Sequence, residues 1–388
     1  MIKCLKLLKV KTEHNISEAA FKEILEIMKI PLSLFKIKKK LEEMVRIQPL
    51  RVDMCTKSCC AFTGNFSHLS KCPICDEPRY LISEASEKPR KFAYFFSLAD
   101  RLKIQYENKE RAEELMYRHD YCSNAKSMKN GNFIEDIYDG ARYQHLVEKS
   151  FFMDSRDIGL SASCDGYQIF RQKRDDCWII MFINNNLSPS ARVKKDNLMI
   201  AMIISGPSEP KDLNSFLLPL VEELKQLEGN IILDVYNLHK SNIKPKFSAG
   251  ISCIDGRTKT IFSLHAHIIT WSGDIPALTK ILHLTGHGSY CGCRFCEIQG
   301  IHHSGMYFPL QPPLDTMEEM RDKVYEVGQL PKRTMQKTLY QLEKIKNGQK
   351  DFIKKFGKIY NKNKSQGLAF LLCSQSNNVF ISIYRHKT

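Results

Sequence analysis

The feature of this 388-residue chain that most constrains its folding is a set of four cysteines arranged as two close pairs. Three residues separate Cys55 from Cys59 and two separate Cys72 from Cys75, with twelve residues between the pairs. A short spacer lets two thiolates of one tight turn reach the same ion, and two such turns complete a closed tetrahedral site for structural zinc. We therefore predict a zinc-binding module over residues 51–82.

The expected compartment decides how the other cysteines are interpreted. The N-terminus interrupts its apolar residues with Lys3 and Lys6, so it lacks the continuous apolar region of a secretory signal. The longest apolar stretch, residues 198–204, is far too short to cross a bilayer. We expect an intracellular protein without disulfides, in which clustered cysteines are metal ligands and scattered ones are core residues. Cys60 is an alternative to Cys59, and His68 is an outside candidate ligand.

A second cysteine pair, Cys293 and Cys296, is a weaker candidate for a metal site. These two residues could share one ion with two further ligands. The candidates for those ligands are His287, Cys291, His302 and His303. The alternative interpretation is a pair of core cysteines beside loop histidines.

The order of the expected elements indicates an α/β fold. Apolar residues recur at helical spacing over residues 12–49, where residues 15–18 form a helix cap, and again over residues 94–120. From residue 157 onward the pattern becomes β-rich. We expect strands at 158–164, 177–183 and 198–205, a helix at 212–227, a strand region at 258–270 and a helix at 275–284. This order matches the start of an RNase H-like mixed sheet, although other mixed-sheet folds share it.

Two aspartates follow strands in that order. Asp165 ends the first expected strand, and Asp274 ends the strand region that precedes the last helix. If the two strands are neighbours, two carboxylates lie together, and oxygen ligands suit Mg²⁺ or Mn²⁺. Metal ions held in this way assist phosphodiester cleavage. By spacing alone the signal is weak, because an Asp before a Gly or before a helix is also an ordinary turn or cap residue.

The charge balance favours a polyanionic partner. The chain has 58 Lys and Arg against 43 Asp and Glu, a formal net charge of +15. The basic run Lys36 and Lys38 to Lys40 is better explained as a solvated helix face than as a DNA contact. The same default applies to the basic residues between the expected strands, which are Lys173, Arg174, Arg192, Lys194 and Lys195.

A succession of short blocks resembles the transposase family of CACTA (En/Spm-type) elements over roughly residues 10 to 310. The blocks are Asp53 to Cys59, Cys72 to Cys75, Asp136 to Gly140, Gly159 to Gly166, Asn186 to Pro189, Gly206 to Pro210, Ser215 to Leu220, Asp274 to Ala277, Gly286-His287 and Cys293 to Cys296. Each block is weak alone, but the set in this order is specific.

The resemblance implies a DDE-type catalytic domain that cuts the ends of its element and joins the freed 3′ hydroxyls to new DNA. By resemblance, Asp165 is the first catalytic acid and Asp274 the second, with Cys293 and Cys296 as the cysteine pair that follows. The third acid, a glutamate on a later helix, has no match. The glutamates on the expected C-terminal helix are Glu318, Glu319 and Glu326. Loss of one member of a concerted set removes most of the rate, so the resemblance also predicts an impaired, truncated copy.

These observations combine into one set of expectations. The expected organisation is a helical segment (1–50), the four-cysteine zinc module (51–82, the cysteine module), a helical connection (90–150), an incomplete RNase H-like core (151–310) and a charged helical end (311–388). We expect structural Zn²⁺, catalytic Mg²⁺ or Mn²⁺, DNA as partner, a nuclear location and no membrane, with a homo-oligomer left open. The main alternative is a non-catalytic, zinc-dependent DNA-binding or interaction protein. A different nuclease on the same fold is a second alternative, and a serine or cysteine hydrolase has least support.

Overall fold

The computed structural model describes residues 2–44, 47–81, 88–128, 134–168, 176–229 and 250–282, together with scattered positions between 286 and 344. The chain forms two compact units, Met1–Leu50 and Arg51–Thr388. No helix in the described ranges combines the length and apolar character needed to span a bilayer.

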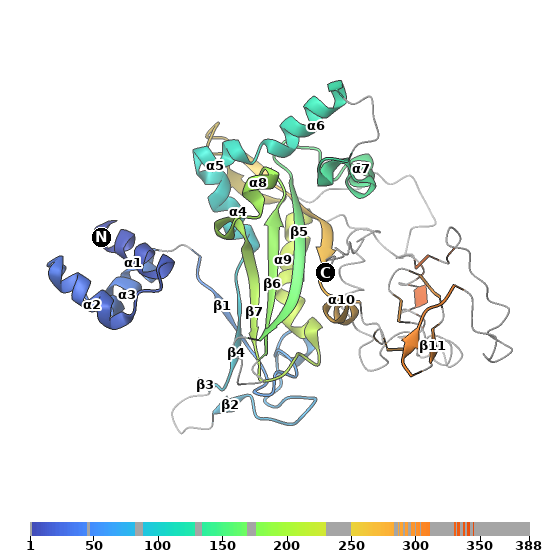
Figure 1. Ribbon diagram of the computed structural model, residues 1–388, viewed down its shortest axis with the longest axis horizontal. Coiled ribbons are helices and arrows are strands. Elements are labelled where there is room, and N and C mark those ends of the chain that lie inside the picture. Colours follow the sequence, from blue (N-terminus) through green and yellow to red (C-terminus); the bar gives the residue numbers. More distant parts are fainter. Residues whose placement is uncertain are drawn as a thin grey trace. The chain divides into compact units, whose positions relative to one another are not determined.

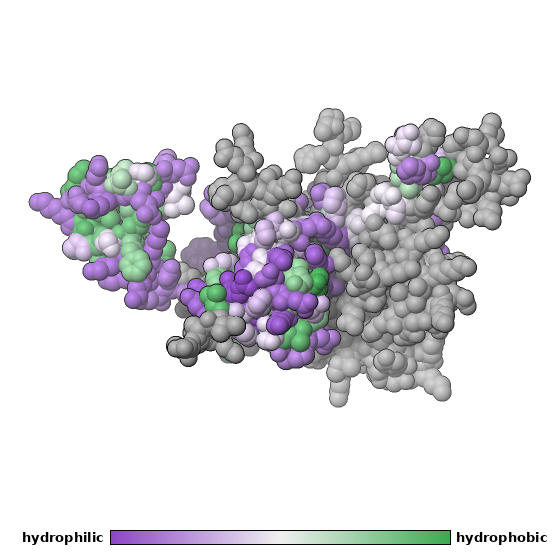
Figure 2. Space-filling view, turned by 90° about the horizontal axis from the view of Figure 1, so that it is seen from below, coloured by the Kyte–Doolittle hydropathy of each residue, from purple (hydrophilic) through white to green (hydrophobic). Residues whose placement is uncertain are grey.

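The N-terminal unit is built from three helices, in keeping with the helical spacing of apolar residues over 12–49. They are α1 (Ile2–Glu13), α2 (Glu18–Ile27) and α3 (Leu34–Met44). Ser17 caps α2 by accepting a hydrogen bond from the Ala20 amide, as the sequence predicted. The core of this unit is small, and its buried side chains are Cys4, Phe21, Leu25 and Ile37. Figure 2 shows apolar side chains on one face of this unit with hydrophilic ones around them.

A six-stranded mixed sheet organises the second unit (Figure 1). Its strands, in spatial order, are β1 (Leu50–Asp53), β4 (Phe92–Phe95), β7 (Met199–Ser205), β6 (Asp176–Asn184), β5 (Ile158–Gln168) and β10 (Ala266–Ser272). Strands β4, β7, β6 and β5 pair antiparallel in that order, whereas β10 pairs parallel with β5. The mixed α/β class expected from the sequence is therefore found.

Helices cover one face of this sheet. The largest is α9 (Leu213–Glu228), which packs on β10 and β4 and ends at Gly229, a residue with a positive φ of 67°. Alongside it lies α4 (Leu98–Glu107), which also contacts β7. Their apolar faces close over the alternate buried residues of the strands, such as Ala162 and Ile180.

Shorter elements complete this unit. The helices are α5 (Lys109–Glu114), α6 (Tyr117–Met128), α7 (Ala141–Glu148), α8 (Pro189–Arg192) and α10 (Ile275–Ile281), with short 3₁₀ turns η1 (Gly64–Phe66), η2 (Ile137–Asp139) and η3 (Lys195–Asn197). Three two-stranded sheets pair β2 (Tyr80–Leu81) with β3 (Lys88–Pro89), β8 (Ile251–Ile254) with β9 (Ile261–Leu264), and β11 (Ile301–His302) with β12 (Met306–Tyr307).

Two expectations from local pattern need correction. The segment expected to be helical from residue 94 begins with strand β4, because Tyr94 and Phe95 pair with β7 far along the chain. The strand region at 258–270 divides into β9 and β10, with β9 turned back onto β8 as a hairpin. In both places a non-local partner decides the local structure, which a periodicity argument does not detect.

The small core of the N-terminal unit yields a stability prediction. Leu25→Ala removes one of its few buried side chains and should destabilise this unit by about 2–5 kcal/mol. The matched control is Ile27→Ala on the same helix, where the side chain is 79% exposed and the change should stay within about 0.5 kcal/mol. Amide hydrogen exchange would measure both, and equal protection of α1–α3 in the two variants would contradict this core assignment.

Candidate functional site

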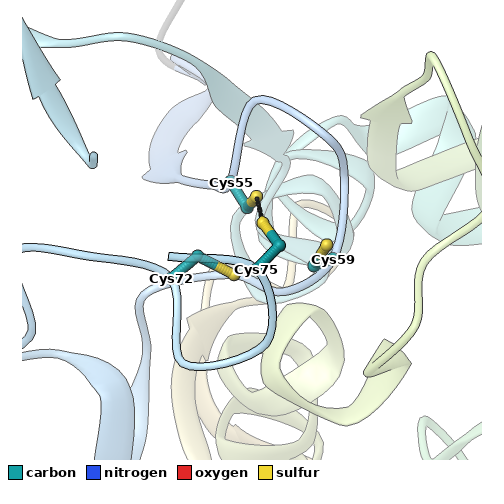
Figure 3. A group of neighbouring side chains, drawn as sticks. All are labelled: Cys55, Cys59, Cys72 and Cys75. Carbon is teal, nitrogen blue, oxygen red and sulfur yellow. Dashed lines mark hydrogen bonds between the residues drawn. The ribbon is translucent and has the colours of Figure 1, made fainter. Parts of the chain in front are cut away.

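The four predicted zinc ligands lie together on two neighbouring turns (Figure 3). The ligand atoms of Cys55, Cys59, Cys72 and Cys75 are all within 4.8 Å of one another, and the Cys55 and Cys75 sulfurs are 3.4 Å apart. Four thiolates around one tetrahedral Zn²⁺ with bonds of about 2.3 Å stand ~3.8 Å apart. This four-cysteine cluster therefore fits a metal ion such as zinc.

Each turn is closed by its own backbone. In the first, the Ser58 amide donates to the Cys55 carbonyl at 2.9 Å, and Ser58 has a left-handed φ of 59°. In the second, the Asp76 amide donates to the Cys72 carbonyl at 2.9 Å, and Asp76 has a φ of 57°. Such tight, left-handed turns aim two side chains at the same point, which explains why the short spacers are needed.

An arginine ties the two turns together. The Arg79 guanidinium donates to the Asp53 carboxylate at 2.6 and 2.9 Å and to the Ser67 carbonyl at 2.7 Å. Its plane also lies over the rings of Phe62 and Tyr80. Both bonds to Asp53 end on its Oδ2 oxygen, and the guanidinium has further N–H groups left for backbone carbonyls.

The thiols differ in how readily they ionise. Burial raises the pKa of Cys55 and that of Cys59 above the usual thiol value. Burial also opposes ionisation of Cys75, but hydrogen bonds from the Glu77 backbone and from the neighbouring thiols outweigh it and lower its pKa. A metal ion is the partner that would stabilise all four as thiolates.

The alternative ligands stand outside this cluster. Cys60 is buried with its sulfur 3.7 Å from that of Cys72, and burial raises its pKa, but the four clustered ligand atoms include Cys59 instead. His68 is exposed and is not among them.

The two candidate acids lie at one edge of the sheet. Strand β5 carries Asp165, and β10 pairs with β5 in parallel register up to Ser272 opposite Ser163. Asp274 follows two residues later, as the N-cap of α10. The backbones are close here, because a Cβ on Gly273 would lie 2.9 Å from the Cys164 carbonyl oxygen.

The electrostatics reflect this proximity. Burial raises the pKa of the Asp165 carboxyl, and the charge of Asp274 raises it further. Asp274 accepts a hydrogen bond from the Ala277 amide at 2.7 Å, which uses one of its two carboxylate oxygens. In the part of the chain that the structure describes, Asp274 is the one carboxylate that raises the pKa of Asp165. A divalent cation bound between these like charges would relieve their repulsion.

The second cysteine pair is close but has no third ligand within the described positions. The sulfurs of Cys293 and Cys296 are 3.3 Å apart, and Arg333 donates to both of their carbonyl oxygens. His302 is exposed on β11. His287, Cys291 and His303 lie outside the described residues, as do Glu318, Glu319 and Glu326.

The basic candidates for DNA contact fall into different environments. Arg192 is buried and pairs with Asp136 at 2.6 Å, so its role is structural. Lys194 and Lys195 are exposed beside η3, whereas Lys173 and Arg174 lie outside the described residues. The lysines of the basic run are exposed on α3, where Lys38 pairs with Glu18.

Sequence reasoning missed the residues that support these two sites. Ser215 accepts a hydrogen bond from the Ala61 amide at 2.9 Å, and the Asp212 amide donates to the Cys59 carbonyl at 2.8 Å. Trp178 packs against Gly166, the residue after Asp165, and Lys280 lies over the Trp178 ring. The motif blocks around 206–220 and 274–277 contain or border several of these positions, but nothing local marks them as partners.

One comparison with known proteins bears on this chain. Residues 134–245 match the family model described as Transposase family tnp2. The matched segment contains Asp165 and extends from before β5 to beyond α9, and it supports a relation to a transposase family. The four-cysteine cluster lies before the matched segment, and Asp274 lies after it. No curated protein matches the chain.

The cluster geometry distinguishes two adjacent cysteines. Cys59→Ser should cost the chain about one equivalent of zinc, because it removes one of four clustered ligands, whereas Cys60→Ser should retain it. Metal content by mass spectrometry, with the thiolate-to-metal absorption of the Co²⁺-substituted protein, would measure this. Loss of metal in Cys60→Ser with retention in Cys59→Ser would contradict the ligand assignment.

The raised pKa of Asp165 predicts a dependence of stability on pH. Because the folded pKa lies above the unfolded one, the ionised carboxyl destabilises the fold at pH 7, and this cost fades as the pH falls toward its ordinary value of 3.8. Asp165→Asn should therefore raise the melting temperature at pH 7 in the absence of divalent metal, and raise it less at a pH near 3.8, the ordinary pKa of the carboxyl.

The matched control for that experiment is Asp196→Asn, at an exposed position in η3. It should leave the melting temperature nearly unchanged at both pH values. Differential scanning calorimetry would measure all three proteins, and a lower melting temperature for Asp165→Asn at pH 7 would refute the repulsion between the two carboxylates.

Proposed function

We propose that the chain is a DNA transposase-like protein of the CACTA class, which cleaves phosphodiester bonds at element ends and transfers the freed strands. The observation that carries this proposal is the parallel pairing of β10 with β5. It brings Asp165, inside the segment that matches a transposase family, beside Asp274. An antiparallel run of strands followed by a helix and a parallel strand is also the arrangement expected of an RNase H-like core.

Asp165 and Asp274 are the residues that would hold Mg²⁺ or Mn²⁺. Their carboxylate oxygens are the ligands that these hard cations prefer, and burial together with the charge of Asp274 raises the pKa of Asp165. When bound, such an ion activates water and stabilises the leaving 3′ oxygen. The protein holds Asp274 in place through the helix cap and Asp165 through its strand.

The four-cysteine cluster would hold Zn²⁺ with a structural role. Its buried apolar side chains are few beyond the cysteines themselves, namely Phe62 with Phe66 and Leu69 packed against it. Val52, Met54 and Ala61 of the same module belong to the main core of the unit, so metal binding would chiefly stabilise the two cysteine turns. Cys293 and Cys296, with His287, form the second proposed zinc site.

The domain organisation proposed with this function follows the sequence boundaries. It has a helical N-terminal segment (1–50), the zinc module (51–82), a connecting region (90–150), the catalytic core (151–310) and a charged C-terminal segment (311–388). A nuclear location and DNA as partner belong to the same proposal, in keeping with the net charge of +15.

A second candidate function is that of a non-catalytic, zinc-dependent DNA-binding protein. The observation that favours it is the pair of acids without a third in the described ranges, since a concerted site that lacks one member loses most of its rate. This candidate keeps the DNA affinity and its salt dependence but cuts no strand.

Cleavage of labelled element-end DNA in Mn²⁺ separates the two functions. The proposed transposase should cut, and Asp165→Ala and Asp274→Ala should each lower the rate by about a thousandfold or more. Asp196→Ala, at an exposed aspartate away from this edge, is the control and should cut at the wild-type rate. Binding of the same DNA, measured by fluorescence anisotropy over a range of salt concentrations, should be retained in every variant. Binding without any cutting by the wild-type chain would favour the second candidate.

A further inference from the structure

A column of side chains stands behind the strand that carries Asp165. The next residue, Gly166, lies flat against the indole of Trp178, because a Cβ at this glycine would be 3.3 Å from the ring. Trp178 is buried, and the Lys280 ammonium lies 4.7 Å from its ring centroid. Lys280 also forms an ion pair with Glu209. Lys280 and Gly166 thus both lie against the Trp178 ring, and the three residues form one stack of contacts.

This stack joins the two acidic residues through their supporting elements. Gly166 follows Asp165 on β5, whereas Lys280 belongs to α10, the helix that Asp274 caps. The Lys280 ammonium is buried, so its attraction to the indole face is weakly screened, whereas the side chain of its partner Glu209 is 63% exposed. A shift of Lys280 would therefore disturb both the backbone at Asp165 and the start of α10.

The loop that supplies Glu209 is held at both ends by the cysteine module. At its start, the Ser58 hydroxyl donates to the Ser205 carbonyl at 3.0 Å, and Lys91 donates to the carbonyl of Gly206. At its end, the Asp212 amide donates to the Cys59 carbonyl at 2.8 Å. Ser58 and Cys59 belong to the first metal-binding turn, so the order of that turn sets where Glu209 stands.

We propose that Glu209, Lys280 and Trp178 are positioning residues that hold Asp165 against Asp274, and that the cysteine module controls them through residues 205–212. This inference rests on the proposed function, because it assigns the acidic edge a metal to bind. Groups that orient a ligand residue without touching the metal commonly change metal affinity by about ten- to a hundredfold when removed. The cysteine module is thereby a support for the acidic edge as well as a folding element.

The chain offers a direct optical probe of this stack. It has two tryptophans, so Trp271→Phe leaves Trp178 as the sole tryptophan, whose emission can be excited selectively. In that background, Lys280→Ala should move the Trp178 emission to longer wavelength, because the ring loses its cover and gains water. The same substitution should weaken Mn²⁺ binding by roughly tenfold, measured from the electron paramagnetic resonance signal of free Mn²⁺. Lys280→Arg, which keeps a cation over the ring, should restore both values.

Matched controls separate this effect from a general loss of charge. Lys211→Ala removes an exposed lysine from the same loop, and Glu222→Gln removes an exposed carboxylate from α9. Both should leave the emission and the Mn²⁺ affinity unchanged. Glu209→Gln keeps the packing but removes the ion pair, and it should reproduce part of the Lys280→Ala effect even if the alanine variant folds poorly by circular dichroism.

A third variant tests the role of the cysteine module. Ser58→Ala breaks its link to the Ser205 carbonyl while leaving all four cysteines, so it should shift Trp178 emission and weaken Mn²⁺ binding with the zinc content unchanged. Unchanged emission and Mn²⁺ affinity in Lys280→Ala and Glu209→Gln would overturn the inference and leave the proposed function intact. If the wild-type chain binds no Mn²⁺, the proposed metal site is wrong. A shift of the Trp178 emission in these variants would then still support the linkage between Glu209, Lys280 and Trp178.

Discussion

The parallel pairing of β10 with β5 is the contact on which the rest of the second unit depends. It closes the sheet at the edge where α10 begins, and it fixes Gly273 against the Cys164 carbonyl. A parallel neighbour requires a crossover, which α9 provides by packing on β10 and on β4. The same pairing places Asp274 beside Asp165, so the architecture of the sheet and the chemistry of its edge have one origin.

That edge carries an electrostatic cost. Two carboxylates share a small region in which burial and mutual repulsion raise the pKa of Asp165. Such repulsion opposes folding and is common where a protein prepares a binding or reactive site. The surrounding residues supply stiffness, through the cap at Asp274 and the ring of Trp178 behind Gly166.

The cysteine module contributes to the fold in a second way. Its two turns bring together four ligands with few apolar side chains packed around them. Hydrogen bonds also join the module to the end of β7, through the Ser58 hydroxyl and the Ser205 carbonyl, and its backbone bonds to Asp212 and Ser215 at the start of α9. A metal ion that orders those turns would also order the loop between β7 and α9. The stability of the module and the shape of the acidic edge are therefore connected through ordinary hydrogen bonds.

The sequence by itself determined the elements and the candidate ligands. Short-range periodicity and cap residues predict strands β5, β6 and β7, helix α9 with its glycine stop, and α10 with its proline in the first turn. Two short spacers predict the four-cysteine cluster. Only the tertiary structure decided that β4 is a strand, that Arg192 is buried against Asp136, that Cys59 rather than Cys60 completes the cluster, and that Lys280 covers Trp178. The physical reason is range: spacers and caps act within a few residues, whereas strand pairing, ion pairing and desolvation depend on partners that the chain brings together only when it folds.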